Sequence, residues 1–164
     1  MSSAGHGAWF AIIDGAQDRR LVGLVQSCKE YDCLYSGKLE PQLAAASPWL
    51  VRIDPADALL PTWQAYGRGL NWGIMIESAV DLPALRSRLR RFTQAKLPDG
   101  MVALFRFYDP RVFNTYIRAA LPEEREPWFE GGILQYGAEA PGGATMHQYR
   151  LSRGRLMDGN DVVA

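Results

Sequence analysis

The stretch AWFAIIDG, residues 8–15, decides the fold. Its first six residues form a short apolar run of strand length, and Asp14-Gly15 is a turn signal that ends this run. The next segment, RRLVGLVQSC at 19–28, carries apolar residues at helical spacing. The chain is therefore predicted to begin as a strand that hands over to a helix.

The same alternation continues along the chain. Further strands are predicted over 31–35, 48–54, 72–78 and 101–108, and further helices over 61–69, over a segment that follows Asp81, and over 110–120. Strands that alternate with helices indicate an α/β protein. We therefore expect a single α/β domain in which a mixed, partly parallel sheet is flanked by helices.

The pattern loosens after Leu121. PEEREPWFEGG, 122–132, is expected to be a loop or a short helix, and GAEAPGGA, 137–144, a flexible turn. HQYRLSRG, 147–154, is expected to add an edge strand, and RLMDGNDVVA, 155–164, to be a frayed tail. The predicted division is thus an α/β domain over 8–136, followed over 137–164 by a glycine-rich loop, an edge strand and a flexible tail.

Composition and charge narrow the function classes. The 164 residues contain 18 basic and 18 acidic side chains, so no net positive field favours nucleic acid or an anionic membrane. No apolar run is long enough to cross a bilayer, and MSSAGHG lacks the basic flank and apolar core of a signal peptide. We expect neither nucleic acid nor a membrane as a partner.

Cysteine and histidine usage argues against a disulfide framework and a metal centre. Cys28 and Cys33 are interpreted as buried free thiols in a reducing cytosol. His6 and His147 lie far apart in the sequence, so a zinc site is not expected. We predict no metal, no cofactor and no small-molecule substrate.

Three carboxylates near predicted strand ends are the candidates for chemistry. Asp14, Glu77 and Asp109 could together serve a small enzyme if they met at one edge of the sheet. However, the chain has no GxGxxG, no GK[ST] phosphate loop and no GxSxG elbow. The favoured interpretation is that Asp14 caps a turn in which Gly15 supplies a permissive dihedral, and that Glu77 pairs with an arginine.

The segment FRFYDPRVF, 105–113, contains the most informative single residue, Arg106. On a strand over 101–108 it would share a face with Val102, Leu104 and Tyr108. Because both faces of that strand are apolar, the strand is predicted to be central. A buried arginine needs an acidic partner, so we expect Arg106 to contact one of the three carboxylates above.

The dipeptide Asp109-Pro110 predicts the start of a helix. The residue before a proline favours extended dihedrals, which suit an N-cap, and a proline in the first helical position loses no hydrogen bond. We expect Asp109 to accept from the Val112 amide. The predicted structural motif consists of Asp14, Gly15, Arg106, Asp109, Pro110 and Arg111.

Two groups of side chains are candidates for binding a partner, and each has a plainer interpretation. The basic run that contains Arg86 and Arg90 either is a solvated helix face or guides an acidic partner. Trp128, Phe129 and Tyr136 either are interface anchors or cover the sheet. The sequence leaves both pairs of alternatives open.

Four segments, in their order along the chain, carry a family resemblance: AWFAIIDG, LYSGKLEPQLAAASPWLVRID, NWGIMIES and LRRFTQAKLPDGMVALFRFYDPRVF. Together they resemble the effector-adaptor chaperones of the bacterial type VI secretion system, the Tap or VasW-like family, whose shared domain was long catalogued as a domain of unknown function. The resemblance covers about residues 9–129, and FRFYDPRVF is its most specific part.

This resemblance implies a cytoplasmic adaptor that is not an enzyme. Such a protein holds a toxic effector, its first partner, and helps to load it onto a second partner, the spike-tip protein. The alternatives are a small α/β enzyme that uses the carboxylates at the sheet edge, and a general protein-interaction module unrelated to secretion.

Overall fold

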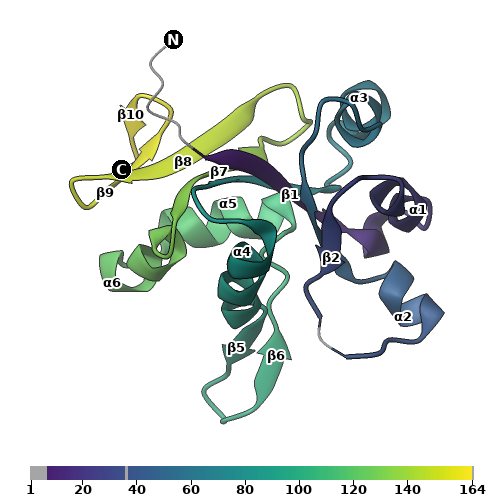
Figure 1. Cartoon of the computed structure of the whole chain (residues 1–164). Coiled ribbons are helices and arrows are strands. Elements are labelled where there is room, and N and C mark those ends of the chain that lie inside the picture. Colours follow the sequence, from purple (N-terminus) through teal and green to yellow (C-terminus); the bar gives the residue numbers. More distant parts are fainter. Residues whose placement is uncertain (1–6, 36, 164) are drawn as a thin grey trace.

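The computed structural model describes residues 7–35 and 37–163, and its central feature is an eight-stranded sheet (Figure 1). The strand order is β10-β9-β8-β7-β4-β1-β3-β2. The strands are β1 (Ala8–Asp14), β2 (Tyr31–Cys33), β3 (Pro48–Arg52), β4 (Gly73–Ser78), β7 (Ile133–Glu139), β8 (Met146–Ser152), β9 (Arg155–Asp158) and β10 (Asp161–Val162). AWFAIID therefore forms a strand inside the sheet, with β3 on one side and β4 on the other.

Apart from the helix Pro41–Ala45, which was not predicted from the sequence, the helices lie where a helix was expected, although several are shorter. They are α1 (Leu21–Gln26), α2 (Pro41–Ala45), α3 (Leu59–Thr62), α4 (Leu82–Leu89), α5 (Pro110–Ala119) and α6 (Pro122–Arg125). A π turn, Trp63–Gly67, continues α3. Asp81 caps α4 as predicted, because its side chain accepts from the Ala84 amide at 3.1 Å.

The α/β class is confirmed, but the partly parallel sheet is wrong. Each strand pairing between described residues is antiparallel. A parallel connection needs a crossover that returns the chain to the edge from which it started. The chain does make such a return, since β2 runs in the same direction as β1, and β4 in the same direction as β3. In each case a strand of the opposite direction lies between the two and pairs with both, so neighbouring strands are antiparallel.

The central strands are apolar throughout because both faces of the sheet are covered. Phe10 and Ile12 face one core, with α4, α5 and the segment around Trp128. Ala11 and Ile13 face a second core, with α1, α3 and Trp72. Figure 1 shows α4 and α5 apart from α1 and α3. An antiparallel sheet covered on both sides thus produces the continuous apolar runs that are typical of parallel sheets.

The C-terminal part is more regular than the sequence predicts. The expected flexible turn over 137–144 begins inside β7, and the expected frayed tail forms β9 and β10. Arg153 and Gly154 have φ values of 51° and 75°, as in a type I′ hairpin turn, and they connect β8 to β9. Because Tyr149 and Leu156 are buried in the first core, these strands complete the sheet.

The predicted central strand over 101–108 does not exist. Its first part forms β6 (Val102–Leu104), which pairs with β5 (Gln94–Lys96) in a separate two-stranded sheet. This hairpin projects from the body of the molecule (Figure 1), and residues 94–104 are called the arm below. Residues 105–108 are not a strand, since Phe107 packs instead among Phe92 and Trp128. Periodicity alone does not distinguish such a buried aromatic run from a strand.

Candidate functional site

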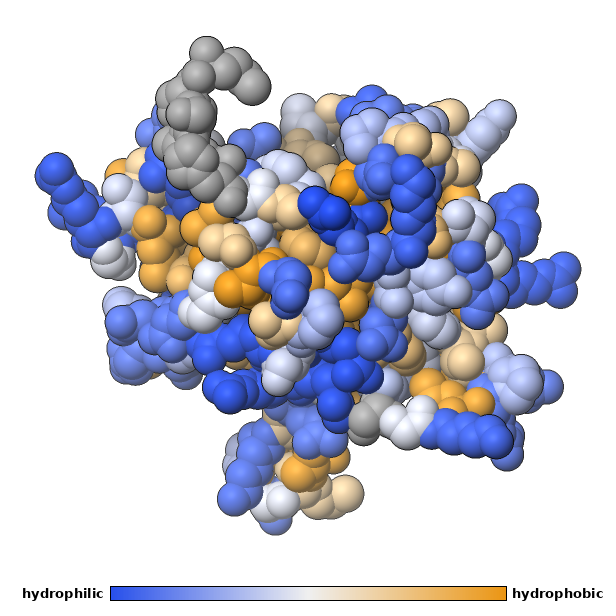
Figure 2. Space-filling view, viewed as in Figure 1, coloured by the Kyte–Doolittle hydropathy of each residue, from blue (hydrophilic) through white to orange (hydrophobic). Residues whose placement is uncertain are grey.

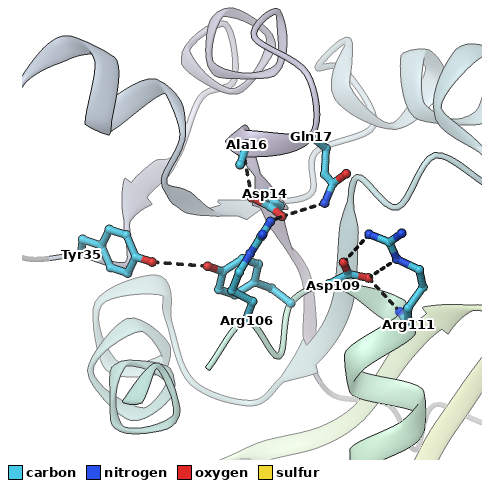
Figure 3. A network of polar contacts seen from close by, with 8 residues as sticks. Asp14, Ala16, Gln17, Tyr35, Arg106, Asp109 and Arg111 are labelled. Carbon is cyan, nitrogen blue, oxygen red and sulfur yellow. Dashed lines mark hydrogen bonds and ion pairs between the residues drawn. The ribbon is translucent and has the colours of Figure 1, made fainter. Parts of the chain in front are cut away.

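Asp14 is the centre of a polar corner where the end of β1 meets the segment before α5 (Figure 3). Its side chain is fully buried and accepts from the Ala16 amide at 3.1 Å and from Gln17 Nε2 at 3.0 Å. Arg106 Nη2 donates to the same carboxylate. The sequence correctly predicted both the turn cap and an acidic partner for Arg106, and the partner is Asp14 rather than Glu77 or Asp109.

Gly15 is needed for space and not for an unusual dihedral, which corrects the sequence interpretation. It is absent from the described glycines with positive φ. A Cβ atom at Gly15 would lie 2.1 Å from the Ala45 carbonyl oxygen and 2.9 Å from that of Ser47. The Gly15 amide also donates to the Ser47 carbonyl at 3.0 Å. The turn after β1 is therefore pressed against the end of α2, where a side chain has no room.

The Arg106–Asp14 pair is asymmetric in its exposure. The Arg106 side chain is 47% exposed, whereas the Asp14 side chain is 1% exposed. The hydrogen bond to Asp14 raises the pKa of Arg106 above its ordinary value. Arg106 thus reaches from the surface to neutralise a carboxylate that water does not reach. The expected burial of this arginine in a central strand is wrong.

Asp109 caps α5 as predicted, with Pro110 in the first helical turn, but its donors differ from the prediction. Its carboxylate accepts from the Arg111 backbone amide at 2.9 Å, and from Nε and Nη2 of the same residue at 3.1 and 2.7 Å. Burial raises the pKa of Asp109, but the hydrogen bonds and charge of Arg111 outweigh burial and lower it overall. One arginine therefore satisfies this carboxylate almost alone.

Tyr108 extends the corner towards β2. Its hydroxyl lies 3.4 Å from the Tyr35 hydroxyl, and burial raises the pKa of Tyr108 far above its ordinary value. Arg86 of α4 donates to the Cys33 carbonyl at 2.6 Å and to the Tyr35 carbonyl at 3.2 Å. Arg86 therefore fastens α4 to the end of β2, which removes it from a solvated binding face.

Glu77 does not belong to the corner. It pairs in register with Trp9, five residues from Asp14 along β1, a separation of about 17 Å. Among the described residues its hydrogen-bonding neighbour is the side chain of Gln135, whose Nε2 donates to Glu77 Oε1 at 3.5 Å, and no arginine pairs with Glu77, contrary to the prediction. Asp14, Glu77 and Asp109 therefore do not converge on one site.

Trp128, Phe129 and Tyr136, the three candidate interface anchors, cover the sheet and are not free on the surface. Trp128 and Tyr136 are 3% and 0% exposed, and Phe129 packs partly buried against the same core. Trp128 stacks on Phe92 with ring centroids 3.9 Å apart, and the Tyr136 hydroxyl donates to the Trp128 carbonyl at 2.6 Å. These side chains cover the sheet and build the core.

Two hydrogen-bonded acidic residues, one buried and one partly exposed, were missed from the sequence because they lie in the segments expected to be irregular. Glu139 of β7 is 7% exposed and accepts from Trp63 Nε1 at 2.9 Å and from the Gly69 amide at 2.6 Å. Asp158 of β9 lies 2.6 Å from His147 Nδ1 and accepts from the Gln148 amide at 2.9 Å. Burial raises the pKa of Asp158, but these hydrogen bonds outweigh burial and lower it.

The cysteines are buried, and the described residues form neither a metal-binding cluster nor a membrane-spanning helix. Cys28 and Cys33 are buried free thiols as expected, and burial raises the pKa of both. Over residues 7–35 and 37–163, no three histidine, cysteine or acidic side chains form a group that could hold a metal ion. No helix in the described part of the chain has the length and apolar character needed to cross a membrane.

Four exposed apolar side chains lie close together in sequence on the arm. Leu97, Met101, Val102 and Leu104 are 42%, 65%, 61% and 63% exposed within eight consecutive residues. Figure 2 shows hydrophobic colour among hydrophilic atoms on this projecting part of the molecule. Arg90, at the base of the arm, is also exposed to solvent. Of the two arginines predicted to bind a partner, Arg86 is engaged by backbone carbonyls, and Arg90 remains exposed.

The chain is thus an α/β domain with a saturated polar corner and a projecting arm that carries exposed apolar side chains. Comparison with family models then places the chain: residues 9–126 match the model described as "Domain of unknown function (DUF4123)". Because the match covers more than half of the chain, the protein belongs to the DUF4123 family. Neither the curated proteins nor the solved structures contain a match.

Proposed function

We propose that this protein is a cytoplasmic bacterial adaptor chaperone that binds a type VI secretion effector and helps to load it onto the spike-tip protein. It performs no reaction of its own. Membership of the DUF4123 family supports this proposal, because the matched residues 9–126 include the segments that resemble the type VI adaptors. The resemblance itself supplies the two partners.

The observation that carries the proposal is the exposed apolar arm. Four large apolar side chains, each more than two-fifths exposed, lie within eight residues of a hairpin outside both cores, and two of them, Val102 and Leu104, share one face. Isolated apolar side chains are normal on protein surfaces, but a local excess of them can mark a site that another protein covers. A protein partner is therefore the occupant that this surface chemistry favours.

The polar corner favours a scaffold over a catalytic site. The carboxylates of Asp14 and Asp109 are already engaged by arginines and by backbone amides of their own turns. The enzyme alternative needs Glu77 beside them, but Glu77 lies about 17 Å away along the sheet. We propose that the corner fixes the start of α5 relative to β1.

Co-expression tests the proposed function. The tagged chain should co-purify with the effector and with the spike-tip protein that are encoded beside its gene. Removing its gene should lower the amount of effector in the cell and in the secreted fraction. A chain that binds neither protein, together with an effector that is stable and secreted without it, would falsify the proposal. Binding to other proteins alone would favour the general interaction module.

A further inference from the structure

One edge of β6, the second strand of the arm, has no partner strand among the described residues. In the described part of the chain β6 pairs with β5 alone, in a two-stranded sheet separate from the main one. Unpaired strand edges present a row of backbone N–H and C=O groups to which another extended chain can add. Proteins usually block such edges with charge, proline or a covering element.

The hydrogen bonds between β5 and β6 show which backbone N–H and C=O groups of β6 have no partner in the hairpin. Phe105 donates to the Thr93 carbonyl at 2.9 Å, and Leu97 donates to the Met101 carbonyl at 2.7 Å. Hydrogen-bonded and non-hydrogen-bonded pairs alternate in an antiparallel ladder. In this register Ala95 and Ala103 form the bonded pair between those two. The backbone N–H and C=O groups of Val102 and Leu104 therefore point away from β5.

The two edges of the hairpin differ in how well they are protected against the addition of another strand. The β5 edge carries Gln94 and Lys96, and an edge lysine opposes the addition of a further strand. The β6 edge carries Val102 and Leu104, which lie two residues apart on one face and are 61% and 63% exposed. The outer edge of β6 is thus open in its backbone and apolar in its side chains.

The charge around the arm selects the chemistry of the occupant. Arg90, Arg91 and Lys96 are exposed, and no carboxylate among residues 7–35 and 37–163 forms a salt bridge with them. Asp99 is the single acidic residue between 90 and 108, and the remaining cation of this segment, Arg106, is bound to Asp14. The neighbouring arginines of α4, Arg86 and Arg88, are held by internal contacts. The segment that carries the arm is therefore net basic, and Glu124 is an acidic residue that lines the same hollow as Arg91.

We propose that β6 accepts an extended, acidic segment of the partner protein as an added β-strand. The backbone of this segment would pair with Val102 and Leu104, and its apolar residues would cover those two side chains. Its carboxylates would meet Arg90, Arg91 and Lys96. This inference rests on the adaptor function proposed above and specifies how the adaptor holds a partner.

Substitutions at position 102 separate backbone pairing from side-chain contact. Val102→Pro removes an edge N–H that makes no bond to β5, whereas Val102→Ala shortens the side chain and keeps that N–H. The affinity of each purified variant for the purified effector and for the purified spike-tip protein is measured by calorimetry. For one of these proteins, V102P should bind at least tenfold more weakly than V102A. Hydrogen exchange at Ala103 checks that the hairpin persists in V102P.

Exchange protection and charge reversal provide two further readouts. In the complex, the amides of Val102 and Leu104 should gain protection from hydrogen exchange, whereas that of Ala103 is already bonded to β5. The double variant R90E/R91E should weaken binding at least tenfold, and added salt should weaken binding by the wild type. R153E/R155E makes the same change of charge at the exposed turn between β8 and β9, and it should bind like the wild type.

The outcomes distinguish this inference from the proposed function. If the wild type binds neither protein, both are overturned. If the wild type binds but V102P binds as V102A does, or the Val102 and Leu104 amides gain no protection, strand addition is wrong and the adaptor function stands. A wild-type dimer that V102P converts to a monomer would assign the edge to a second copy of this chain and would also overturn the inference.

Discussion

At the end of β1, a half-exposed arginine neutralises a carboxylate that has almost no contact with solvent. Removing Arg106 and neutralising Asp14 should therefore cost different amounts of stability. Removing Arg106 leaves a buried carboxylate without its cation, whereas neutralising Asp14 leaves a guanidinium that water can reach. Breaking a buried pair is costly chiefly through the charge that remains buried.

Arg106→Ala should therefore lower the free energy of unfolding by about 3 kcal/mol, and Asp14→Asn by less. The double variant should be more stable than R106A, because no buried charge remains. Urea unfolding of the three proteins measures this cycle. As a control, Arg20→Ala breaks an ion pair in which the arginine is 84% exposed, and it should cost under about 1 kcal/mol. Equal losses for R106A and R20A would contradict the account.

The lowered pKa of Asp109 predicts a loss of stability in acid. The pKa of this carboxyl lies below its ordinary value of 3.8 in the folded protein, so the unfolded chain takes up the proton first. Its contribution is present above about pH 4 and is lost as the pH falls through the folded pKa. Asp109→Asn keeps a capping oxygen but removes this proton linkage.

We expect the stability of D109N to fall less than that of the wild type between pH 6 and about pH 3, when both are unfolded by urea at each pH. Asp158 has a lowered pKa as well and remains in both proteins, so D109N should still lose some stability in acid. Identical pH profiles for the two proteins would show that Asp109 does not contribute.

Individual residues were predictable from the sequence where local chemistry decides their role. The dipeptide Asp109-Pro110 identifies a helix start by itself, and an arginine within an apolar run identifies the need for an acidic partner. The sequence does not reveal which carboxylate is the partner, because Asp14 and Arg106 meet only through the tertiary fold. The spatial role of Gly15 depends in the same way on the distant carbonyl of Ala45.

At the scale of elements, the turn between β7 and β8 is held against the segment after α3. The buried carboxylate of Glu139 accepts from Trp63 and from the Gly69 amide, and Gly143 lies against the same amide. A Cβ atom on Gly143 would lie 2.2 Å from the Gly69 nitrogen and 2.5 Å from Glu139 Oε2. The glycine-rich segment is therefore a close backbone contact.

Gly143→Ala and Gly142→Ala form a matched pair, since both glycines have positive φ, 74° and 86°, but a Cβ atom on Gly142 meets nothing within 4 Å. G142A should cost about 1 kcal/mol for its dihedral alone. G143A should cost at least about 2 kcal/mol more, because it forces two packed segments apart. Thermal or urea unfolding measures both. Equal costs would show that the segment is free to move.

Helices and strands were predicted well where the sequence pattern is long and local. They were predicted poorly where the pattern is short or fits more than one kind of structure. Helices α4 and α5 could be predicted from their N-cap residues and from the helical spacing of their apolar residues. The apolar run that ends in residues 105–108 satisfies a strand pattern, but its aromatic side chains fill the core between helices and sheet. The direction of the strands depends on how the connections run in space, which periodicity does not encode.

For the whole molecule, the sheet extends beyond the segment that defines the family. The family match ends at residue 126, whereas β7, β8, β9 and β10 lie between residues 133 and 162. Tyr136 and Tyr149 are fully buried in the same core as Phe10 and Phe113 of the matched segment. The C-terminal strands are thus part of the folded unit, and not an appendage to it.

A chain truncated after residue 136 should therefore fail to unfold cooperatively. It would cut β7 short, remove β8 to β10, and take Tyr149 and Leu156 out of the core. Circular dichroism during thermal unfolding measures the effect. Truncation after residue 159 is the control, because it removes β10 with its exposed residues and should preserve a cooperative transition. A cooperative transition for residues 1–136 would restore the division between 136 and 137.

The central claim is that this molecule joins two other proteins. Light scattering coupled to size-exclusion chromatography tests it directly, with the purified chain, the effector and the spike-tip protein mixed singly, in pairs and together. The account predicts a complex of the chain with the effector, and one larger complex that contains all three proteins when they are mixed together. A chain that elutes alone from every mixture would contradict it.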